Sequence, residues 1–382
     1  MRWNDGMKLC EEHKCYGCDA CINICPVNAI QMTKEQNGFL YPELDEKQCI
    51  DCGLCGAACP GNETNFSDII RKDNVVEYAC IHKDKRIVHT SQSGGAFYGL
   101  AETILEQGGI VYGAAFDEGN YVVHLKVDQH EDLWRLQGSK YVQSRIGDTF
   151  KEIGKLLQDG RTVLFSGTSC QAAGLILYLK NKKIKAANLY TCDLLCHGIP
   201  SHIVFKDYIR FLEEKYGAKI KKPNLRDKNI INWKTHVESY CDSHGNIHTE
   251  SLWTELFYSD LLLRRSCGDC IFGKENWISD ITVGDLWKGE EYINNFNEYQ
   301  DGISVALVHT EKGNDLIKSG KFSLQTIEHY SQRYSAKLSY QAPRFWKVYY
   351  SKGFETALKK FTSYGGLVTK SKRKILRRLK MW

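Results

Sequence analysis

The sequence predicts a multidomain protein of the combined α+β and α/β class, and three features of the chain support this fold class. The chain has 382 residues, of which 42% are hydrophobic and 25% charged, so it is long enough for roughly two or three folded domains. Eight of its 16 cysteines lie within residues 15–59. From about residue 75 onward, strand-like and helix-like segments alternate, which is typical of an α/β body.

The crowded cysteines form an internal duplication. The pattern C-x2-C-x2-C-x3-C-P starts at Cys15 and recurs at Cys49, 34 residues later. In bacterial two-cluster ferredoxins, the first three thiolates of such a run bind one cubane and the fourth completes the other cluster. A structural zinc site is the alternative, but zinc sites normally lack the crossed fourth cysteine and its proline. We therefore predict two 4Fe-4S clusters with crossed ligand sets: Cys15, Cys18, Cys21 and Cys59 for cluster I, and Cys49, Cys52, Cys55 and Cys25 for cluster II.

The chain is expected to divide into four segments. Residues 1–65 form a bacterial-type ferredoxin domain with two 4Fe-4S clusters, which ends in a polar linker at residues 61–68. Residues 75–160 and 161–340 form a two-part α/β body, and residues 341–382 form an aromatic and then basic tail. Helices are expected at residues 95–107, 149–158 and, after a turn at 166–169, up to residue 180. Strands are expected at residues 75–82, 109–116, 121–127, 162–165, 188–195, 236–240, 281–283 and 304–309.

Two loops rich in serine and glycine precede predicted helices, at residues 91–96 and 166–171. Such a loop at a helix N-terminus offers backbone N–H groups to a phosphate. Helix capping by Ser93 explains the first loop nearly as well. Neither loop has the G-x-G-x-x-G or G-K-[ST] pattern, which argues against a Rossmann NAD site and against an ATPase.

Several motifs follow the double cysteine run in a fixed order. They lie at residues 91–95, 138–144, 163–171, 196–200 and 279–287. Together with the cysteine run they resemble the coenzyme F420 hydrogenase/dehydrogenase beta-subunit family over roughly residues 12–310. The resemblance implies a two-part α/β flavin-binding body that holds FAD and a third 4Fe-4S cluster. Members of the family include deazaflavin-handling hydrogenase subunits, a plant reductase of hydroxymethyl chlorophyll and bacterial proteins associated with surface-polysaccharide synthesis.

The resemblance implies that residues of these motifs contact the flavin. Lys140 is expected to place a positive charge beside the flavin pyrimidine or phosphate, where the charge stabilises the reduced anion and raises the potential. The alternative for Lys140 is a solvated loop lysine. The candidate cofactor-binding residues are Ser91, Ser93, Gly94, Gly95, Lys140, Tyr141, Gln143, Ser144, Gly167 and Thr168.

A further group of cysteines indicates a third metal centre. Cys267 and Cys270 form a C-x2-C pair, and Cys192 and Cys196 lie beside a predicted strand end, so that one site could gather four thiols. The family motif matches Cys196, Cys267 and Cys270, and it favours Cys170 over Cys192 as the fourth ligand. A zinc site and buried free thiols are the alternatives. The remaining cysteines are expected to be structural, with Cys80 and Cys241 in the core and Cys10 exposed.

Two polar residues in the family motifs are candidates for proton delivery to a substrate at the flavin. These candidate catalytic residues are His197 and Asp285. The alternative is structural, with His197 capping a turn and Asp285 accepting hydrogen bonds from backbone N–H groups.

The charge of the chain is concentrated at its end. Residues 370–380 hold seven basic groups and no acid, and removing these seven from the net charge of +5 leaves −2 for the rest. Nucleic acid is therefore not expected as the main partner. The basic residues of 367–382 alternate at helical spacing with apolar ones, which indicates peripheral contact with an anionic membrane or an acidic partner, unless the tail is only a frayed solubilising terminus. With no apolar leader at the start and no long uncharged run, we expect a cytoplasmic protein.

The sequence thus predicts an iron-sulfur flavoprotein oxidoreductase. Electrons from a ferredoxin-type donor pass through the 4Fe-4S clusters to the flavin, which reduces a small organic substrate, with surface-polysaccharide synthesis as one setting. Two alternatives stay open. One is oxidation of reduced coenzyme F420, with electrons leaving through the clusters. The other is a non-catalytic electron-transfer subunit that serves a partner oxidoreductase in a larger complex.

Overall fold

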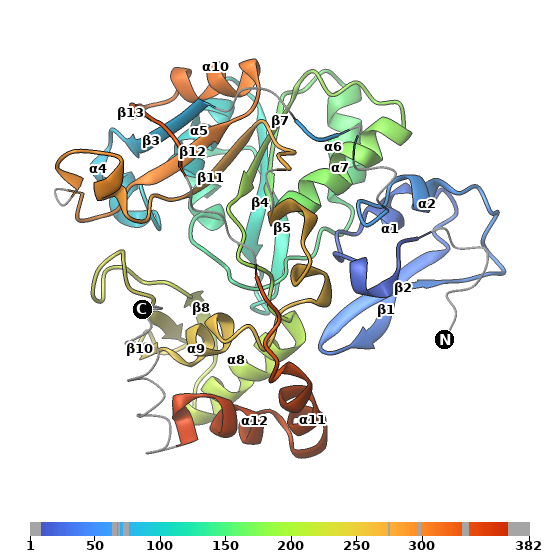
Figure 1. The fold of residues 1–382 in the computed structure, drawn as a ribbon, viewed down its shortest axis with the longest axis vertical. Coiled ribbons are helices and arrows are strands. Elements are labelled where there is room, and N and C mark those ends of the chain that lie inside the picture. The colour runs from blue at the N-terminus through green and yellow to red at the C-terminus, as the bar shows by residue number, and fades with distance from the viewer. Residues whose placement is uncertain are drawn as a thin grey trace.

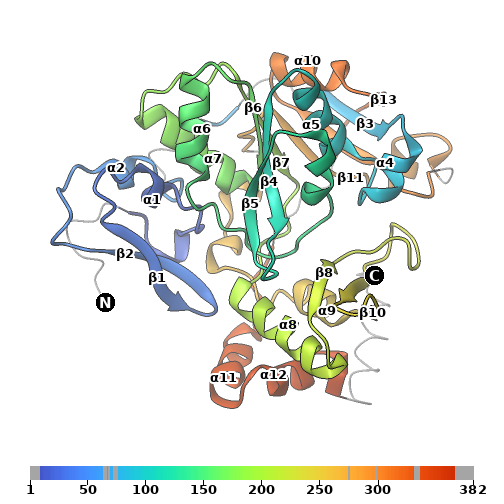
Figure 2. The ribbon, with the colours of Figure 1, turned by 180° about the vertical axis from the view of Figure 1, so that it is seen from behind.

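A computed structural model describes residues 9–62, 67, 69–71, 76–273, 276–296, 299–330 and 336–365. Two smaller parts flank a body that is built on a central sheet (Figure 1). A small N-terminal part, drawn in blue, lies beside helices α6 and α7 of the body, and a mainly helical part lies below the sheet in the same view. Figure 2 shows the same arrangement from behind.

The N-terminal part is built on a β-hairpin in which β1 (Ile30–Gln36) pairs antiparallel with β2 (Phe39–Leu44). The turn between the strands consists of Asn37 and Gly38, whose φ angles of 49° and 72° are those that a type I′ hairpin turn requires. The helices of this part are η1 (Glu12–Lys14), α1 (Ala20–Ile24) and α2 (Leu54–Ala57). Both α1 and α2 contact α7 of the body, so the cysteine loops lie at the boundary between the two parts.

A mixed eight-stranded sheet forms the centre of the body, with the order β13-β3-β12-β11-β7-β6-β4-β5. Strands β11, β7, β6 and β4 are parallel to one another, and antiparallel strands flank them on both sides. The strands are β3 (Val76–His82), β4 (Ile110–Phe116), β5 (Val122–Val127), β6 (Val163–Gly167), β7 (Leu189–Leu194), β11 (Ile281–Asp285), β12 (Ser304–Val308) and β13 (Phe322–Ile327). Strand β3 lies between β12 and β13, so the expected boundary at residue 160 does not separate two sheets.

Helices cover both faces of this sheet. The alternation of side chains along β4 shows this, because Ile110 and Tyr112 pack with α6 and α7 whereas Val111 and Ala115 pack with α5. The helices of the body are α4 (Lys85–Thr90), α5 (Ala96–Glu106), η2 (His130–Leu136), α6 (Thr149–Gln158), α7 (Ser169–Asn181) and α10 (Glu311–Ser319). The loop at residues 91–95 leads directly into α5, so the position of this helix fixes the loop.

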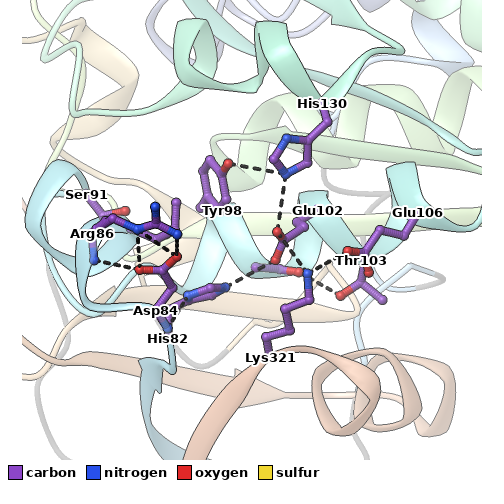
Figure 3. Close-up of polar contacts among 12 residues, drawn as sticks. His82, Asp84, Arg86, Ser91, Tyr98, Glu102, Thr103, Glu106, His130 and Lys321 are labelled. Carbon is purple, nitrogen blue, oxygen red and sulfur yellow. Dashed lines mark hydrogen bonds and ion pairs between the residues drawn. The ribbon is translucent and has the colours of Figure 1, made fainter.

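A buried carboxylate anchors α5. Glu102 is 7% exposed, and its oxygens lie 3.2 Å from His82 Nε2, 3.2 Å from His130 Nε2 and 3.1 Å from Lys321 Nζ (Figure 3). Burial opposes the charged form, but the hydrogen bonds from Lys321, His130 and His82 outweigh it and lower the pKa of Glu102. The cluster joins α5 to β3, to η2 and to the start of β13, and it thereby holds the loop before α5 in place.

The part below the sheet has a hydrophobic core that continues to Val122 of β5. Its elements are α8 (His202–Tyr216), β8 (Ile220–Asn224), β9 (Glu238–Asp242), β10 (Ile247–Glu250), α9 (Leu252–Tyr258), α11 (Ala342–Lys352) and α12 (Phe354–Phe361). Residues from 341 onward were expected to form a tail. Instead Phe345, Trp346 and Leu358 are buried against α8, because these aromatic and aliphatic side chains recur on the inner faces of two helices.

The basic segment at residues 367–382, for which membrane contact was predicted, lies outside the described residues. Short one-turn helices complete the described chain: η3 (Arg265–Cys267), η4 (Ile271–Gly273), η5 (Gly289–Glu291) and η7 (Ser363–Gly365). Among the described helices, none combines the length and the apolar character needed to cross a bilayer.

The packing of α11 gives a stability prediction. Phe345 is fully buried, and Phe345→Ala should lower the free energy of unfolding by about 3–5 kcal/mol because it leaves a cavity in the core of the lower part. Tyr340, which is 89% exposed, is the matched control, and Tyr340→Ala should change the free energy by less than about 0.5 kcal/mol. Urea denaturation followed by tryptophan fluorescence measures both, and equal small effects would mean that α11 contributes nothing to the core.

Candidate functional site

Five cysteines line one cavity next to the hairpin: Cys10, Cys15, Cys18, Cys21 and Cys59. The cavity therefore brings together the four predicted ligands of cluster I, including the last cysteine of the second run. The expectation that Cys10 is exposed is wrong, since its side chain is 6% exposed. Its thiol hydrogen-bonds with Cys15 and Cys59, because the chain before η1 folds back over the cavity.

A second cavity is lined by the four predicted ligands of cluster II: Cys25, Cys49, Cys52 and Cys55. Backbone N–H groups of Ala29 and Asp51 donate to the sulfurs of Cys25 (3.3 Å) and Cys49 (3.4 Å). Cys52 is exposed, so this cavity opens near the surface. In both cavities the fourth cysteine of one run lies with the first three of the other, as the crossed pattern predicts, and ligation itself stays a prediction.

A third cavity brings together four cysteines from the body: Cys170, Cys196, Cys267 and Cys270. Cys170 lies at the start of α7 and Cys196 follows β7. Cys192 is 1% exposed within β7, opposite Ile281 of β11, and is not part of this cavity. The structure thus places Cys170, and not Cys192, beside the other three thiols.

The other two cysteines are placed as follows. Cys80 is fully buried in β3, as expected, whereas Cys241 in β9 is only half-buried. Within the described ranges, no three Cys, His, Asp or Glu side chains converge on the position of a single metal ion. The thiols surround cavities instead.

A much larger cavity, of about 840 Å³, adjoins the third thiol cavity. It lies at the carboxyl ends of the parallel strands, where β6 ends at Gly167, β7 leads to Leu195 and β11 ends at Asp285. Open α/β sheets bind their ligands at this edge. Nine of the ten candidate cofactor-binding residues line it: Ser91, Ser93, Gly95, Lys140, Tyr141, Gln143, Ser144, Gly167 and Thr168.

Gly94 is the candidate that does not line the large cavity. A Cβ atom at this position would lie 2.3 Å from the carbonyl oxygen of Cys80 and 2.7 Å from the backbone nitrogen of Ser304. Glycine is therefore needed because the loop approaches the backbone of β3 and β12, and not because a ligand contacts it.

Lys140 is not a solvated loop lysine, because it is only 9% exposed. Its ammonium group donates to the carbonyl oxygens of Gln137 (2.6 Å) and Gly138 (3.1 Å). Burial lowers the pKa of Lys140 to about 7. An anion bound in the large cavity would therefore favour the protonated form of this side chain.

Several candidate side chains are already engaged by the protein. Ser93 Oγ donates to the carbonyl oxygen of Ile303 (2.6 Å), and Ser144 Oγ accepts from Gln171 Nε2 (3.0 Å). Thr168 and Gln171 form a capping box at the start of α7. These hydroxyl groups therefore hold the loops in shape through contacts within the protein.

Two buried polar atoms of the cavity lining lack a hydrogen-bond partner: Gln92 Oε1 and Arg226 Nε. Buried polar groups in folded proteins are almost always hydrogen-bonded, so unpartnered ones indicate a site for a polar ligand. The volume, the position at the sheet edge and these two atoms fit a flavin nucleotide.

The two candidate catalytic residues both line the large cavity. His197 Nε2 lies 2.7 Å from Asp260 Oδ1, a side-chain partner that the turn-capping alternative does not include. Asp285 Oδ2 accepts a 2.6 Å hydrogen bond from Arg226 Nη1 in an ion pair. Asp285 therefore has a side-chain cation as its partner, which neither sequence interpretation included.

One wall of the cavity is aromatic and basic and was not predicted from the sequence. Arg226 is 1% exposed, and its guanidinium lies 5.2 Å from the centre of the Trp287 ring. His236 Nε2 is 2.9 Å from the Tyr258 hydroxyl, and burial lowers the pKa of His236 to about 3. These residues follow no motif. The one signal in the sequence is the motif at residues 279–287, which contains both Asp285 and Trp287.

The fold and the grouped thiols define the class of this protein as an iron-sulfur electron-transfer oxidoreductase type, with an N-terminal ferredoxin-like domain and a larger α/β body. Residues 14–62 match the family "4Fe-4S dicluster domain", and residues 160–329 match the C-terminal part of the family "Coenzyme F420 hydrogenase/dehydrogenase, beta subunit". The match of residues 160–329 to this family, together with the dicluster match, confirms the resemblance derived from the motifs.

Three curated relatives match a short stretch of this chain. An uncharacterized ferredoxin of Methanocaldococcus jannaschii is 35% identical over 54 residues, which are 14% of this chain and 69% of that protein. A second uncharacterized ferredoxin of the same organism is 41% identical over 61 residues, 16% of this chain and 30% of that protein. The polyferredoxin-like subunit of an aliphatic sulfonate oxidoreductase from Pyrococcus furiosus is 37% identical over 51 residues, 13% of this chain and 28% of that protein.

Among solved structures, a chain of the F420-reducing [NiFe] hydrogenase complex from Methanosarcina barkeri is similar to this chain with a TM-score of 0.48 and 18% identity. The similarity covers 79% of this chain and 96% of the hydrogenase chain.

Proposed function

We propose that this chain is an iron-sulfur flavoprotein oxidoreductase that passes electrons from a ferredoxin-type donor through 4Fe-4S clusters to an FAD, at which a small organic substrate is reduced. The contact between cavities carries the proposal. Tyr16 lines the cluster I cavity, the third thiol cavity and the large cavity, and Cys170 and Cys196 line the last two. The cluster I cavity, the third thiol cavity and the large cavity therefore adjoin one another, which supports electron transfer from clusters to a flavin.

Electrons enter at the cluster II cavity in this proposal. Ile50, which lines that cavity, is 61% exposed, and Cys52 is also exposed. This surface is therefore open to close approach by a ferredoxin-type donor or by a partner oxidoreductase. The cluster I cavity lies deeper, against α7, and receives electrons from cluster II.

The large cavity is the proposed flavin site. Its volume of about 840 Å³ lies within the range of about 300–1,000 Å³ that is usual for small-molecule sites. The backbone of the loops at residues 91–95 and 167–168 would hold the nucleotide, and Lys140 would neutralise an anionic part of it. A bound flavin supplies the conversion between single electrons and two-electron chemistry.

The substrate would bind at the wall formed by Arg226, His236, Tyr258 and Trp287. His197 lies in the lining of both the thiol cavity and the large cavity, and its contact with Asp260 holds the ring in one orientation. We assign proton transfer to His197, while Asp285 orients Arg226 through their ion pair.

Anaerobic purification and reconstitution test this function. The expected content is about twelve irons and one FAD for each chain, with the flavin reduced on mixing with reduced ferredoxin. Protein with intact clusters and no flavin would overturn the flavoprotein assignment and favour the non-catalytic electron-transfer subunit. Rapid bleaching of a dye acceptor by reduced coenzyme F420 in the presence of the protein would instead support the reverse direction.

Lys140 gives a pH prediction for the proposed flavin site. Its pKa of about 7 means that the side chain is mostly charged at pH 6 and mostly neutral at pH 8. Binding of the anionic FAD to flavin-free protein should therefore be stronger at pH 6 than at pH 8, by up to about tenfold. Fluorescence titration of FAD measures the effect.

The matched variants are Lys140→Met and Lys234→Met. Both lysines line the large cavity, but Lys234 is exposed. Lys140→Met should abolish the pH dependence and Lys234→Met should keep it. An unchanged pH dependence in Lys140→Met would show that another group titrates.

A further inference from the structure

Arg264 is a buried cation at the boundary between the ferredoxin-like domain and the body. The residue is 0% exposed, and it precedes the segment that carries Cys267 and Cys270. Its guanidinium donates to the carbonyl oxygen of Cys15 at 2.7 Å, to that of Leu40 at 2.9 Å and to Gln143 Oε1 at 3.1 Å. All three acceptors are neutral.

The charge of Arg264 is directed toward a predicted cluster ligand. Its Nη2 atom lies 3.5 Å from Cys15 Sγ, and among the described residues no carboxylate forms an ion pair with it. Asp19 also lines the cluster I cavity, but its Oδ2 accepts a hydrogen bond from the backbone N–H of Ile146 (3.2 Å). A buried cation is stabilised by nearby negative charge, which the Cys15 thiolate would supply in addition to the Asp19 carboxylate.

Each cluster cavity is lined by one aspartate, Asp19 for cluster I and Asp51 for cluster II, so the difference between them is the contact of Arg264 with Cys15. Asp51 is the charged residue among those that line it, and no lysine or arginine of the described chain lines that cavity. Reduction adds one negative charge to a cluster, so a neighbouring cation raises the reduction potential and a neighbouring anion lowers it. The effect is stronger for the buried Arg264 than for the exposed Asp51, since solvent and salt screen exposed charges.

We propose that Arg264 raises the reduction potential of cluster I above that of cluster II, so that electrons entering at the surface move inward toward the third thiol site. Arg264 is thus a positioning residue that acts on the potential of the cluster. This inference rests on the ligand sets of the proposed function. It adds an energetically favourable direction for the step between these two clusters, inward from cluster II to cluster I.

Potentiometric titration followed by paramagnetic resonance tests the inference on the full-length, reconstituted protein. Arg264→Gln should lower the ratio of reduced to oxidised cluster I at a fixed potential by at least about tenfold, which corresponds to about 59 mV for a one-electron couple. Cluster II should keep its potential. Arg264→Lys, which retains the charge, should stay within about threefold of the parent ratio, and Arg265→Gln, at the exposed neighbouring residue, should change neither cluster.

If the Arg264→Gln protein does not retain its clusters, a second variant provides the test. Asp51→Asn removes the exposed charge beside cluster II, and asparagine tolerates the left-handed backbone at this position, where φ is 48°. This variant should raise the reduction potential of cluster II and thereby reduce the difference in reduction potential between the two clusters. The inference would be overturned if Arg264→Gln shifted the reduction potentials of both clusters equally. It would also be overturned if neither Arg264→Gln nor Asp51→Asn changed the difference between the two potentials. Parent protein without any cluster signal would contradict the proposed function instead.

Discussion

The Cys170→Ser variant is expected to bind about eight irons instead of about twelve and to lose reduction of the flavin by ferredoxin. Cys170 lines both the third thiol cavity and the large cavity, so its sulfur lies where the inner cluster would meet the flavin. Loss of one thiolate ligand destabilises the cubane, and the two ferredoxin clusters remain reducible without a relay to the body. Iron analysis and stopped-flow absorbance of the flavin measure the two effects.

Cys192→Ser is the matched control, because Cys192 was the competing candidate for the same ligand. Its side chain is 1% exposed in β7 and is not part of the thiol cavity. This variant should keep all irons and the rate of flavin reduction, although the buried hydroxyl will cost about 1–3 kcal/mol of stability. Loss of four irons in Cys192→Ser together with retention in Cys170→Ser would reverse the assignment.

Double variants are expected to reveal the crossed ligand sets of the ferredoxin-like domain. Cys25 and Cys49 line the same cavity although they belong to different runs, so Cys25→Ser and Cys49→Ser should each remove cluster II. Combining Cys25→Ser with Cys49→Ser should therefore still remove only about four irons, because both changes act on cluster II. Combining Cys25→Ser with Cys15→Ser should remove about eight irons, because Cys15 lines the other cavity.

The opposite pattern would identify uncrossed sets. If each run bound its own cluster, Cys25→Ser and Cys15→Ser would act on one cluster and lose only about four irons together. Paramagnetic resonance of each single variant after dithionite reduction is the second measurement. One cluster of the ferredoxin-like domain should remain in each, without the spin coupling that two adjacent clusters of this domain produce.

Local sequence patterns predicted a large part of the fold. The helix expected at residues 149–158 is α6 (Thr149–Gln158), and the strands expected around residues 110 and 304 are β4 and β12. These elements have clear periodicity and clear ends, which depend on neighbours in sequence. The order of the strands could not be predicted in the same way, because the position of β3 between β12 and β13 depends on contacts between residues more than 200 positions apart.

In the candidate site, too, features set by local sequence were predicted and features set by tertiary packing were not. Thiol groups that share the two cavities of the ferredoxin-like domain were predicted because the spacing of cysteines in a loop sets which sulfurs can meet, whereas Cys170 of the third cavity was predicted from the family motif. The wall that includes Arg226 and His236 was missed because these residues come from the part below the sheet and reach the cavity only through tertiary packing. Gln143 was expected to contact a cofactor, yet its amide donates to the carbonyl oxygen of Gly17 at 3.0 Å, an interaction between two parts of the chain that no local pattern encodes.

The insertion of β3 between β12 and β13 has a consequence for synthesis on the ribosome. The ferredoxin-like domain, whose hairpin and cysteine loops are close in sequence, can close as soon as it emerges. The central sheet must wait until β13 has been made, and such non-local pairing is slow. A nascent chain interrupted near residue 300 should therefore carry a protease-resistant, iron-binding N-terminal fragment followed by an unprotected body.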